Sequence, residues 1–166
     1  FAVRKTLQDT KNVSTKALGG STQQYVDMRL AEVYLNYAEA VIESNQGDAA
    51  LAKTYLNAIR KRAGHTDEIP ATIENILKER RIECVFEGTR AWDLIRRRDY
   101  HLVFNSTKRT SLIPIMDLRI NPPKYLFLRV TNYYDQAANG RTFQPRSYYL
   151  EIPGVASNKL VQNPGY

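Results

Sequence analysis

Two amphipathic helical patterns that follow each other with almost no linker constrain the fold of this chain more than any other feature. In the first, apolar side chains recur from residue 26 onward on one helix face, and polar side chains fall on the opposite side. The apolar members are Leu30, Val33, Tyr34, Tyr37, Ala38 and Val41, and the polar members are Arg29, Glu32, Asn36, Glu39 and Glu43. This pattern predicts a helix with an apolar arc wide enough to contact two neighbours.

A glycine and an aspartate mark where the first helix ends and the second begins. Gly47 can adopt the left-handed conformation that often follows a helix C-terminus. The Asp48 side chain can accept hydrogen bonds from the free amides of the next helix. The second helix ends at Gly64, and its apolar face is Ala49, Ala52, Leu56, Ile59 and Ala63. Because the linker is so short, residues 26–64 are predicted to form an antiparallel helix hairpin.

A second helix pair is predicted farther along the chain. Its first helix begins at Thr72, a possible N-cap after Pro70, and continues to Glu87. Gly88 stops or kinks this helix, and a short fourth helix then carries Trp92, Leu94 and Ile95. Two helix pairs in tandem indicate a repeat of the tetratricopeptide kind.

After residue 99 the helical period fades. Prolines in "LIPIMDLRINPPKYLFLRV" prevent long helices, and "YLFLRV" indicates a strand or an extended packed segment. The predicted fold class is mainly α, with tetratricopeptide-like helix hairpins followed by a largely irregular segment punctuated by proline and glycine. We expect residues 1–166 to be a single domain or fragment, with an extended approach at 1–23, helical hairpins at 24–98 and an irregular packed segment at 99–166.

The composition narrows the classes of function. No apolar run approaches the roughly 20 residues that cross a bilayer as a helix. The single cysteine, Cys84, excludes an internal disulfide, and His65 and His101 lack the spacing of metal ligands. The net charge of +7 can attract phosphate, but it is equally the balance of a solvated exterior, which we favour. We expect no cofactor, no metal and no nucleic-acid partner.

The stretch "ERRIECVFEGTRAWDLIRR", residues 79–97, combines acids and arginines around a short apolar run. On a helical wheel Arg80 falls within an apolar face, with Glu83 and Glu87 beside it; that face is Ile73, Ile76, Leu77 and Cys84. Glu79 and Glu83, four residues apart, repel each other unless a cation lies nearby. Arg80 and Arg90 are the cations that the sequence offers.

Three interpretations of this stretch compete. A glycosidase would need two carboxylates that flank a bond, whereas Glu83 and Glu87 point the same way. A nucleic-acid patch would need arginines interleaved with aromatics, whereas acids alternate with them here. Ion pairs between packed helices fit best, and the residues expected in this structural network are Arg80, Glu83, Glu87, Arg90 and Asp93. Such a network fixes register more than it adds net stability, and we expect no catalytic residue.

A pair of tyrosines in the C-terminal half is the candidate ligand site. Tyr133 and Tyr134 lie in "TNYYDQAANGRTF" close to Arg141. Aromatic rings offer a stacking surface for sugars, and the neighbouring polar groups can hydrogen-bond. We predict Tyr133, Tyr134 and Arg141 as ligand-binding residues, although a tyrosine pair in a loop is more often packed or merely exposed.

Four stretches carry a resemblance that spans nearly the whole chain. They are "DMRLAEVYLNYAEA" (27–40), "LNAIRKRAG" (56–64), "ERRIECVFEGTRAWDLIRR" (79–97) and the closing "QNPGY" (162–166). In this order and spacing they resemble the C-terminal region of the SusD/RagB family of outer-membrane nutrient-binding lipoproteins. The chain departs from the family at Glu151 of "YYLEIP", where the first proline of Pro-Ile-Pro is usual.

The resemblance implies a function that the spacing of residues does not. It implies non-enzymatic binding of glycans, or of peptides, at the cell surface and delivery to a SusC-like TonB-dependent transporter. It further implies a lipid anchor at the outer membrane, carried by a missing N-terminal portion of the same protein, because the chain resembles only about the last third of a typical member. The alternative function is a tetratricopeptide-type adaptor that holds a protein segment in its groove.

Overall fold

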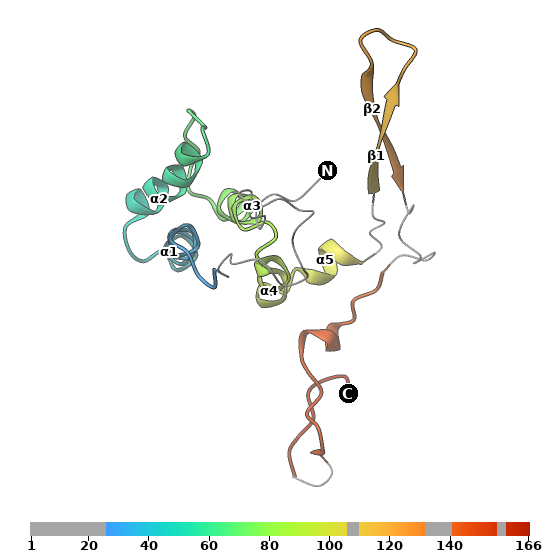
Figure 1. Cartoon of the computed structure of the whole chain (residues 1–166). Coiled ribbons are helices and arrows are strands. Elements are labelled where there is room, and N and C mark those ends of the chain that lie inside the picture. Colours follow the sequence, from blue (N-terminus) through green and yellow to red (C-terminus); the bar gives the residue numbers. More distant parts are fainter. Residues whose placement is uncertain (1–25, 106–109, 132–140, 156–158) are drawn as a thin grey trace, which may run out of the picture. The chain divides into compact units, whose positions relative to one another are not determined.

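The computed structural model describes residues 26–105, 110–131, 141–155 and 159–166. The chain divides into two compact units, Phe1–Arg90 and Ala91–Tyr166 (Figure 1). The first contains α1 (Leu30–Ser44), α2 (Ala49–Arg62) and α3 (Ile73–Glu83), and α4 (Thr89–Arg96) begins at its end. The second contains α5 (Tyr100–Phe104), β1 (Thr110–Asp117), β2 (Lys124–Thr131) and a 3-10 turn at Pro145–Tyr148. The fold is mainly helical, as predicted, and the approach expected at 1–23 lies outside the described residues.

The core of the first unit forms where α1 packs against both α2 and α3. Two small residues, Ala38 of α1 and Ala52 of α2, are fully buried and allow the two helix backbones to approach closely. The other buried members of this core are Leu35, Val41, Leu56, Ile59 and Ile76. The predicted helix hairpin is therefore present, and α3 supplies the second neighbour that the wide apolar arc of α1 required.

The orientation of α1 differs from the predicted one at several positions. Leu30 and Val33 are 62% and 44% exposed, whereas Leu35, which the pattern left out, is fully buried. Glu39, assigned to the solvent side, is also buried. The reason is that a helix with two neighbours has two buried strips. A pattern that considers one apolar face does not detect the second strip, above all where a side chain in it is polar, as at Glu39.

The predicted N-caps of α2 and α3 are confirmed. The Asp48 carboxylate accepts hydrogen bonds from the amides of Ala50 and Leu51 at 2.8 and 3.0 Å. The Thr72 hydroxyl accepts from the amide of Asn75 at 3.3 Å. Each bond satisfies backbone amides that the first turn of a helix leaves without an internal acceptor.

Two predicted C-termini need correction. The left-handed residue that caps α1 is Asn45, with φ 53°, and Gly47 follows in the linker with φ 99°. Asparagine tolerates this conformation better than most residues do. α3 ends at Glu83 and does not reach Glu87, and a turn with Phe86 at φ 65° follows it. A positive φ cannot continue a right-handed helix, so the helix stops before Gly88.

The cap of α2 leads to a stability prediction. We expect Asp48→Ala to lower the free energy of unfolding by about 1 kcal/mol, because two amides lose their acceptor. Asp48→Asn keeps a side-chain oxygen at the same place and is expected to change it by only a few tenths of a kcal/mol, roughly. Urea denaturation followed by circular dichroism measures both. Equal stabilities of the two variants would contradict the capping role.

The connection between α2 and α3 is fixed by one buried side chain. The Asn57 carboxamide exchanges two hydrogen bonds with the backbone of Ile69, accepting from its amide and donating to its carbonyl, both at 2.9 Å. The same carboxamide donates to the Lys53 carbonyl one turn earlier on α2. These bonds hold the segment ahead of α3 against α2.

In the second unit, β1 and β2 form an antiparallel hairpin (Figure 1). β2 covers the predicted extended stretch "YLFLRV". β1, which contains Pro114, lies in the segment 99–166 that was expected to be largely irregular. Since β1 pairs only with β2 among the described residues, it has an edge on which a proline nitrogen needs no partner. Asp117 ends β1 and accepts three hydrogen bonds from Arg119, which lower the pKa of its carboxyl group.

Candidate functional site

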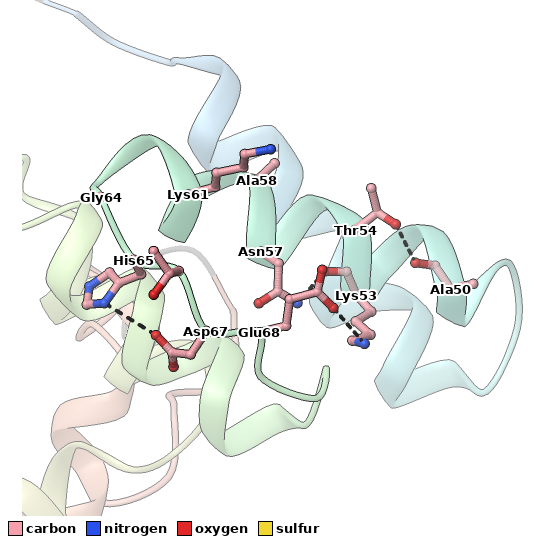
Figure 2. Close-up of a pocket in the computed structure, with 11 residues that line it drawn as sticks. Ala50, Lys53, Thr54, Asn57, Ala58, Lys61, Gly64, His65, Asp67 and Glu68 are labelled. Carbon is pink, nitrogen blue, oxygen red and sulfur yellow. Dashed lines mark hydrogen bonds and ion pairs between the residues drawn. The ribbon is translucent and has the colours of Figure 1, made fainter.

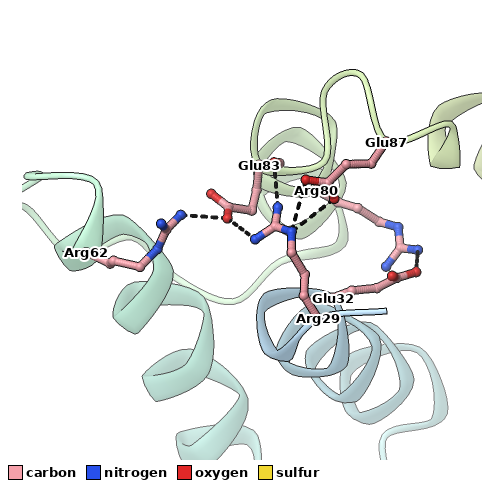
Figure 3. A network of polar contacts seen from close by, with 6 residues as sticks. All are labelled: Arg29, Glu32, Arg62, Arg80, Glu83 and Glu87. Atoms are coloured by element: carbon pink, nitrogen blue, oxygen red, sulfur yellow. Dashed lines mark hydrogen bonds and ion pairs between the residues drawn. The ribbon is translucent and has the colours of Figure 1, made fainter. Parts of the chain in front are cut away.

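A cluster of six charged side chains joins α1, α2 and α3 (Figure 3). We call it the ion cluster, and its members are Arg29, Glu32, Arg62, Arg80, Glu83 and Glu87. Arg29, just ahead of α1, donates to the Glu83 carboxylate, to the Glu83 carbonyl at 2.7 Å and to both Glu87 carboxylate oxygens at 3.0 Å. Arg62 of α2 donates to the same Glu83 oxygen at 2.6 Å. One carboxylate therefore binds guanidinium groups from two other parts of the unit.

Arg80 makes the second half of the ion cluster. Its side chain is 7% exposed and reaches from α3 to α1, where it donates to Glu32 at 3.0 Å and to the Asn36 side-chain oxygen. The helical pattern predicts Arg80 on the apolar face of its helix, and the structure confirms this, since Ile76 and Cys84 on that face are also buried. A buried guanidinium at this position needs acceptors, and the polar strip of α1 supplies them.

The neighbouring carboxylate of Glu79 is held separately from Glu83. Arg60 of α2 lies 3.5 Å from Glu79 through one nitrogen and 2.6 Å from Asp67 through another. Glu79 is 8% exposed at its side chain, so it needs this cation. Arg60 is thus the cation beside Glu79, and Arg29 and Arg62 are cations beside Glu83. None of the three was predicted from the sequence.

Arg29 is a member of the ion cluster with a shifted pKa. Burial alone would lower the pKa of the Arg29 guanidinium, but its hydrogen bonds to Glu87 and Glu83 outweigh this effect and raise the pKa above its ordinary value. The two carboxylates therefore stabilise the charged form of Arg29. Glu83 and Glu87 both bind this one cation, Glu87 through Nε of Arg29 and Glu83 through one of its terminal nitrogens.

The remaining members of the predicted network lie in α4. Arg90 is half-buried, and Asp93 is buried with its carboxylate 3.0 Å from Arg96 of the same helix. Residues that the sequence analysis missed are Arg29, Glu32 and Arg62. The sequence signal for Arg29 and Glu32 was present. These residues lie three positions apart at the start of α1, and their charges are opposite to those of their partners Glu83 and Arg80 on α3.

The predicted ligand-binding residues fall partly outside the described residues. Tyr133 and Tyr134 are not among the residues that the structure describes. Arg141 is described, and its guanidinium carbon lies 5.5 Å from the centre of the Phe104 ring. Phe104 belongs to an aromatic group in which ring centres lie 4.6 to 5.1 Å apart, with Tyr100, Phe143 and Tyr148 as the other members.

A second arginine contacts two aromatic rings in this unit. The Arg98 guanidinium lies 4.8 Å from the Tyr148 ring centre and 4.6 Å from that of Tyr149, and it donates to the Tyr149 hydroxyl at 2.8 Å. Tyr148 in turn lies 2.7 Å from His101 Nδ1 through its hydroxyl. These contacts occupy the hydroxyl groups of both tyrosines and one face of each ring.

The closing motif "QNPGY" is bound to the segment that precedes it. Gln162 exchanges two hydrogen bonds with the Ile152 backbone, and the Tyr166 hydroxyl donates to the Tyr149 carbonyl at 3.1 Å. Gly165 has φ 90°, and a Cβ there would lie 2.7 Å from Cβ of Arg146. Both the backbone conformation and the lack of space require glycine at this position of the motif.

An open groove of about 870 Å³ runs along α2 and the loop after it (Figure 2). Lys53 and Glu68 form an ion pair of 2.9 Å within it, and this hydrogen bond lowers the pKa of Glu68. His65 and Asp67 lie 3.8 Å apart at the other end. The described residues that line the groove include no tyrosine, tryptophan or phenylalanine, so it lacks the stacking surface that sugar sites use.

Cys84 is expected to behave as a core residue and not as a nucleophile. Its side chain is buried, and burial together with the charge of Glu87 raises the pKa of the thiol. We expect the folded chain to react with DTNB more than about tenfold slower than the urea-unfolded chain. The single cysteine makes the signal specific, and Cys84→Ser provides the blank. Equal rates in the two states would place the thiol at the surface.

Comparison with known proteins identifies relatives along the whole chain. The sequence profile of the SusD family matches residues 1–166. A SusD-like protein of Bacteroides ovatus is 30% identical over 94% of this chain, and SusD-like protein P2 of Formosa agariphila is 30% identical over 88% of it. The chain spans only 31% and 26% of these two curated relatives.

Solved structures give the same result. Surface glycan-binding protein A from Bacteroides thetaiotaomicron is 32% identical to this chain with a TM-score of 0.53. The same protein in complex with laminarihexaose is 30% identical with a TM-score of 0.54. Each match covers 84% of this chain and 24% of the solved one. The helical unit, the bound "QNPGY" motif and these matches lead to one conclusion: the chain belongs to the SusD family.

Proposed function

We propose that this chain is part of a non-enzymatic protein that binds glycans at the cell surface and delivers them to a TonB-dependent transporter in the outer membrane. The observation that carries the proposal is the similarity to surface glycan-binding protein A in complex with laminarihexaose, at 30% identity over 84% of this chain. A short β-glucan oligosaccharide is therefore the first ligand class to test. The transporter, the lipid anchor and the surface location are part of this proposal, and family membership supports them.

The first unit would serve as the scaffold of this protein. Within it, the ion cluster would hold α1, α2 and α3 in register and perform no chemistry. Arg90 and Asp93 in α4 would also have a structural and not a catalytic role. Three features support this role: each carboxylate of Glu83 and Glu87 binds Arg29, Arg80 is buried, and its partners Glu32 and Asn36 lie on a neighbouring helix. Among the described residues, no group of acids, histidines and cysteines is arranged to hold a metal ion.

The ligand would be held by aromatic stacking and a few polar contacts, as in most carbohydrate sites. Tyr133, Tyr134 and Arg141 remain the candidates in this chain. The position of Arg141 over the Phe104 ring supports a role for this region, because it places a guanidinium donor there for the polar groups of a ligand. The described part of the chain contains no helix long and apolar enough to span a membrane.

The test is isothermal titration calorimetry of the protein in the longest form that its gene encodes. We expect saturable heat with laminarihexaose or with another oligosaccharide of a panel that varies in linkage. Tyr133→Ala, Tyr134→Ala and Arg141→Ala each probe the candidate contacts, with Trp92→Ala as an exposed aromatic control outside the hairpin. No saturation with any sugar of the panel would refute glycan binding, and saturation only with peptides titrated in parallel would indicate peptide capture instead.

The non-enzymatic part of the proposal has its own test. The same sugars are incubated with the protein, and their lengths are followed by chromatography over a day. We expect no shortening. Hydrolysis that is lost in Glu83→Gln, in a variant that remains folded by circular dichroism, would show that the ion cluster performs chemistry.

A further inference from the structure

The β1–β2 hairpin exposes apolar side chains on both of its faces. Seven large apolar residues of its strands are 45–61% exposed: Leu112, Ile115, Met116, Tyr125, Leu126, Phe127 and Leu128. The connection between the strands continues this surface, since Leu118 is 73% and Ile120 41% exposed. In soluble proteins, contiguous apolar surface of this kind marks an interaction site.

The strand register separates these side chains into two different surfaces. Ile113 pairs with Leu128 and Ile115 with Leu126, which makes one face aliphatic. Pro114 pairs with Phe127, and Met116 pairs with Tyr125, so the opposite face is aromatic. Residues directly opposite each other in an antiparallel pair point to the same side, and neighbours along a strand point to opposite sides. Each apolar face would therefore have to be buried by a separate packing partner.

A ribbon of this composition is not stable in water by itself. Two-stranded hairpins are marginal unless a further strand or a helix packs on them. Both strands of this hairpin also have an edge with no further strand among the described residues, and open edges with apolar faces promote aggregation. The sequence therefore fits a ribbon that is covered in the working protein.

We propose that the β1–β2 hairpin is a docking element that is buried on both faces by segments of the same SusD-family protein that lie outside this chain. The length of the relatives supports this occupant, because the chain spans 31% and 26% of two curated relatives and 24% of the solved structures. The inference rests on the exposed hairpin and on family membership, and it does not depend on the proposed function. It would therefore survive a failure to bind glycans.

Two other occupants fit the hairpin less well. A lipid bilayer would leave the open strand edges without hydrogen-bond partners in the hydrocarbon region, which proteins avoid. A second copy related by two-fold symmetry would cover one patch of the surface and leave the other face in water. A groove within a larger chain can cover both faces and can also supply backbone partners to the edges.

Hydrogen exchange distinguishes these cases. Amides of β2 are followed in the 166-residue chain and in the longest form that the gene encodes, at two protein concentrations. We expect exchange at Leu126 and Leu128 to slow by about a hundredfold or more in the longer form only, independently of concentration. Equal protection of these amides in the 166-residue chain would overturn the proposal, and so would protection that grows with protein concentration. A gene that encodes no further residues would overturn it as well.

A matched pair of variants tests burial of each face separately. Ile115→Thr and Ile115→Val place side chains of the same shape on the aliphatic face, and they differ by a hydroxyl group whose burial is unfavourable. Phe127→Tyr adds a hydroxyl group to the aromatic face, with Phe127→Leu as the apolar comparison. In the longer form we expect Ile115→Thr to have a Tm several degrees below that of Ile115→Val, and Phe127→Tyr to be less stable than the native protein.

In the 166-residue chain the Ile115 pair should have the same Tm, because the side chain is in water in both variants. Equal Tm values of Ile115→Thr and Ile115→Val in the longer form would overturn burial of the aliphatic face even if the hydrogen-exchange result is positive. The calorimetric titration of the proposed function is unaffected by this outcome, so failure of docking and failure of glycan binding are separate results.

Discussion

Leu35→Ala is expected to lower the free energy of unfolding of the first unit by about 2–5 kcal/mol. The Leu35 side chain is fully buried, and its removal leaves a cavity in a core whose other large, fully buried side chains are Leu56 and Ile76. In a unit with so small a core, this is a large fraction of the total stability. Urea denaturation followed by circular dichroism at 222 nm measures the change.

Leu30→Ala is the matched control, because it makes the same substitution on the same helix at a residue that is 62% exposed. Leucine and alanine have similar helix propensities, so the expected change is within about 0.5 kcal/mol. The pair also decides between the structure and the helical pattern, which had assigned Leu30 and not Leu35 to the buried face. A larger loss for Leu30→Ala would mean that α1 is rotated relative to the structure.

Arg80→Met is expected to lower the free energy of unfolding by roughly 3 kcal/mol. Methionine has a similar reach but donates no hydrogen bond, so the Glu32 carboxylate and the Asn36 oxygen lose the guanidinium that joins α3 to α1. The loss comes mainly from acceptors that are left without a donor in a partly buried place. The net value of the intact ion pair is smaller.

Arg81→Met provides the comparison, since Arg81 is the next residue of α3 and is exposed. The same atoms are changed, and the expected effect is within about 0.5 kcal/mol. If both variants melt at the temperature of the native protein, Arg80 is in solvent and its contacts with Glu32 and Asn36 on α1 are not formed. A double variant Arg80→Met with Glu32→Gln should recover part of the loss, because it removes the charge that the first change leaves unpaired.

Local rules predicted the helices well because local contacts form them. The side chains of Asp48 and Thr72 cap α2 and α3 through bonds to residues two or three positions away, so the sequence alone contains the interaction. The prediction of where α1 ends was less accurate, because both Asn45 and Gly47 can adopt a positive φ and the sequence pattern does not distinguish between them. The strand β1 was missed because its only described partner is a strand on the far side of the hairpin turn.

The charged stretch shows what one sequence leaves open. Its helical wheel placed Arg80 inward, but it could not identify the partner helix. The acceptor Glu32 lies 48 positions away, and the cation Arg29 lies 54 positions from Glu83. Nothing in the local pattern encodes such distances. Complementary charge on α1 and α3 was the available sign, and it becomes useful only after the two helices are known to pack.

The shared carboxylate of Glu83 has a consequence for how the first unit opens. Because Arg29 and Arg62 both bind it, fraying of the last turn of α3 releases a contact at the start of α1 and another at the end of α2 simultaneously. The three helices should therefore unfold as one cooperative segment. Slowly exchanging amides in all of them would report a common opening free energy, and helix-by-helix melting should not be seen.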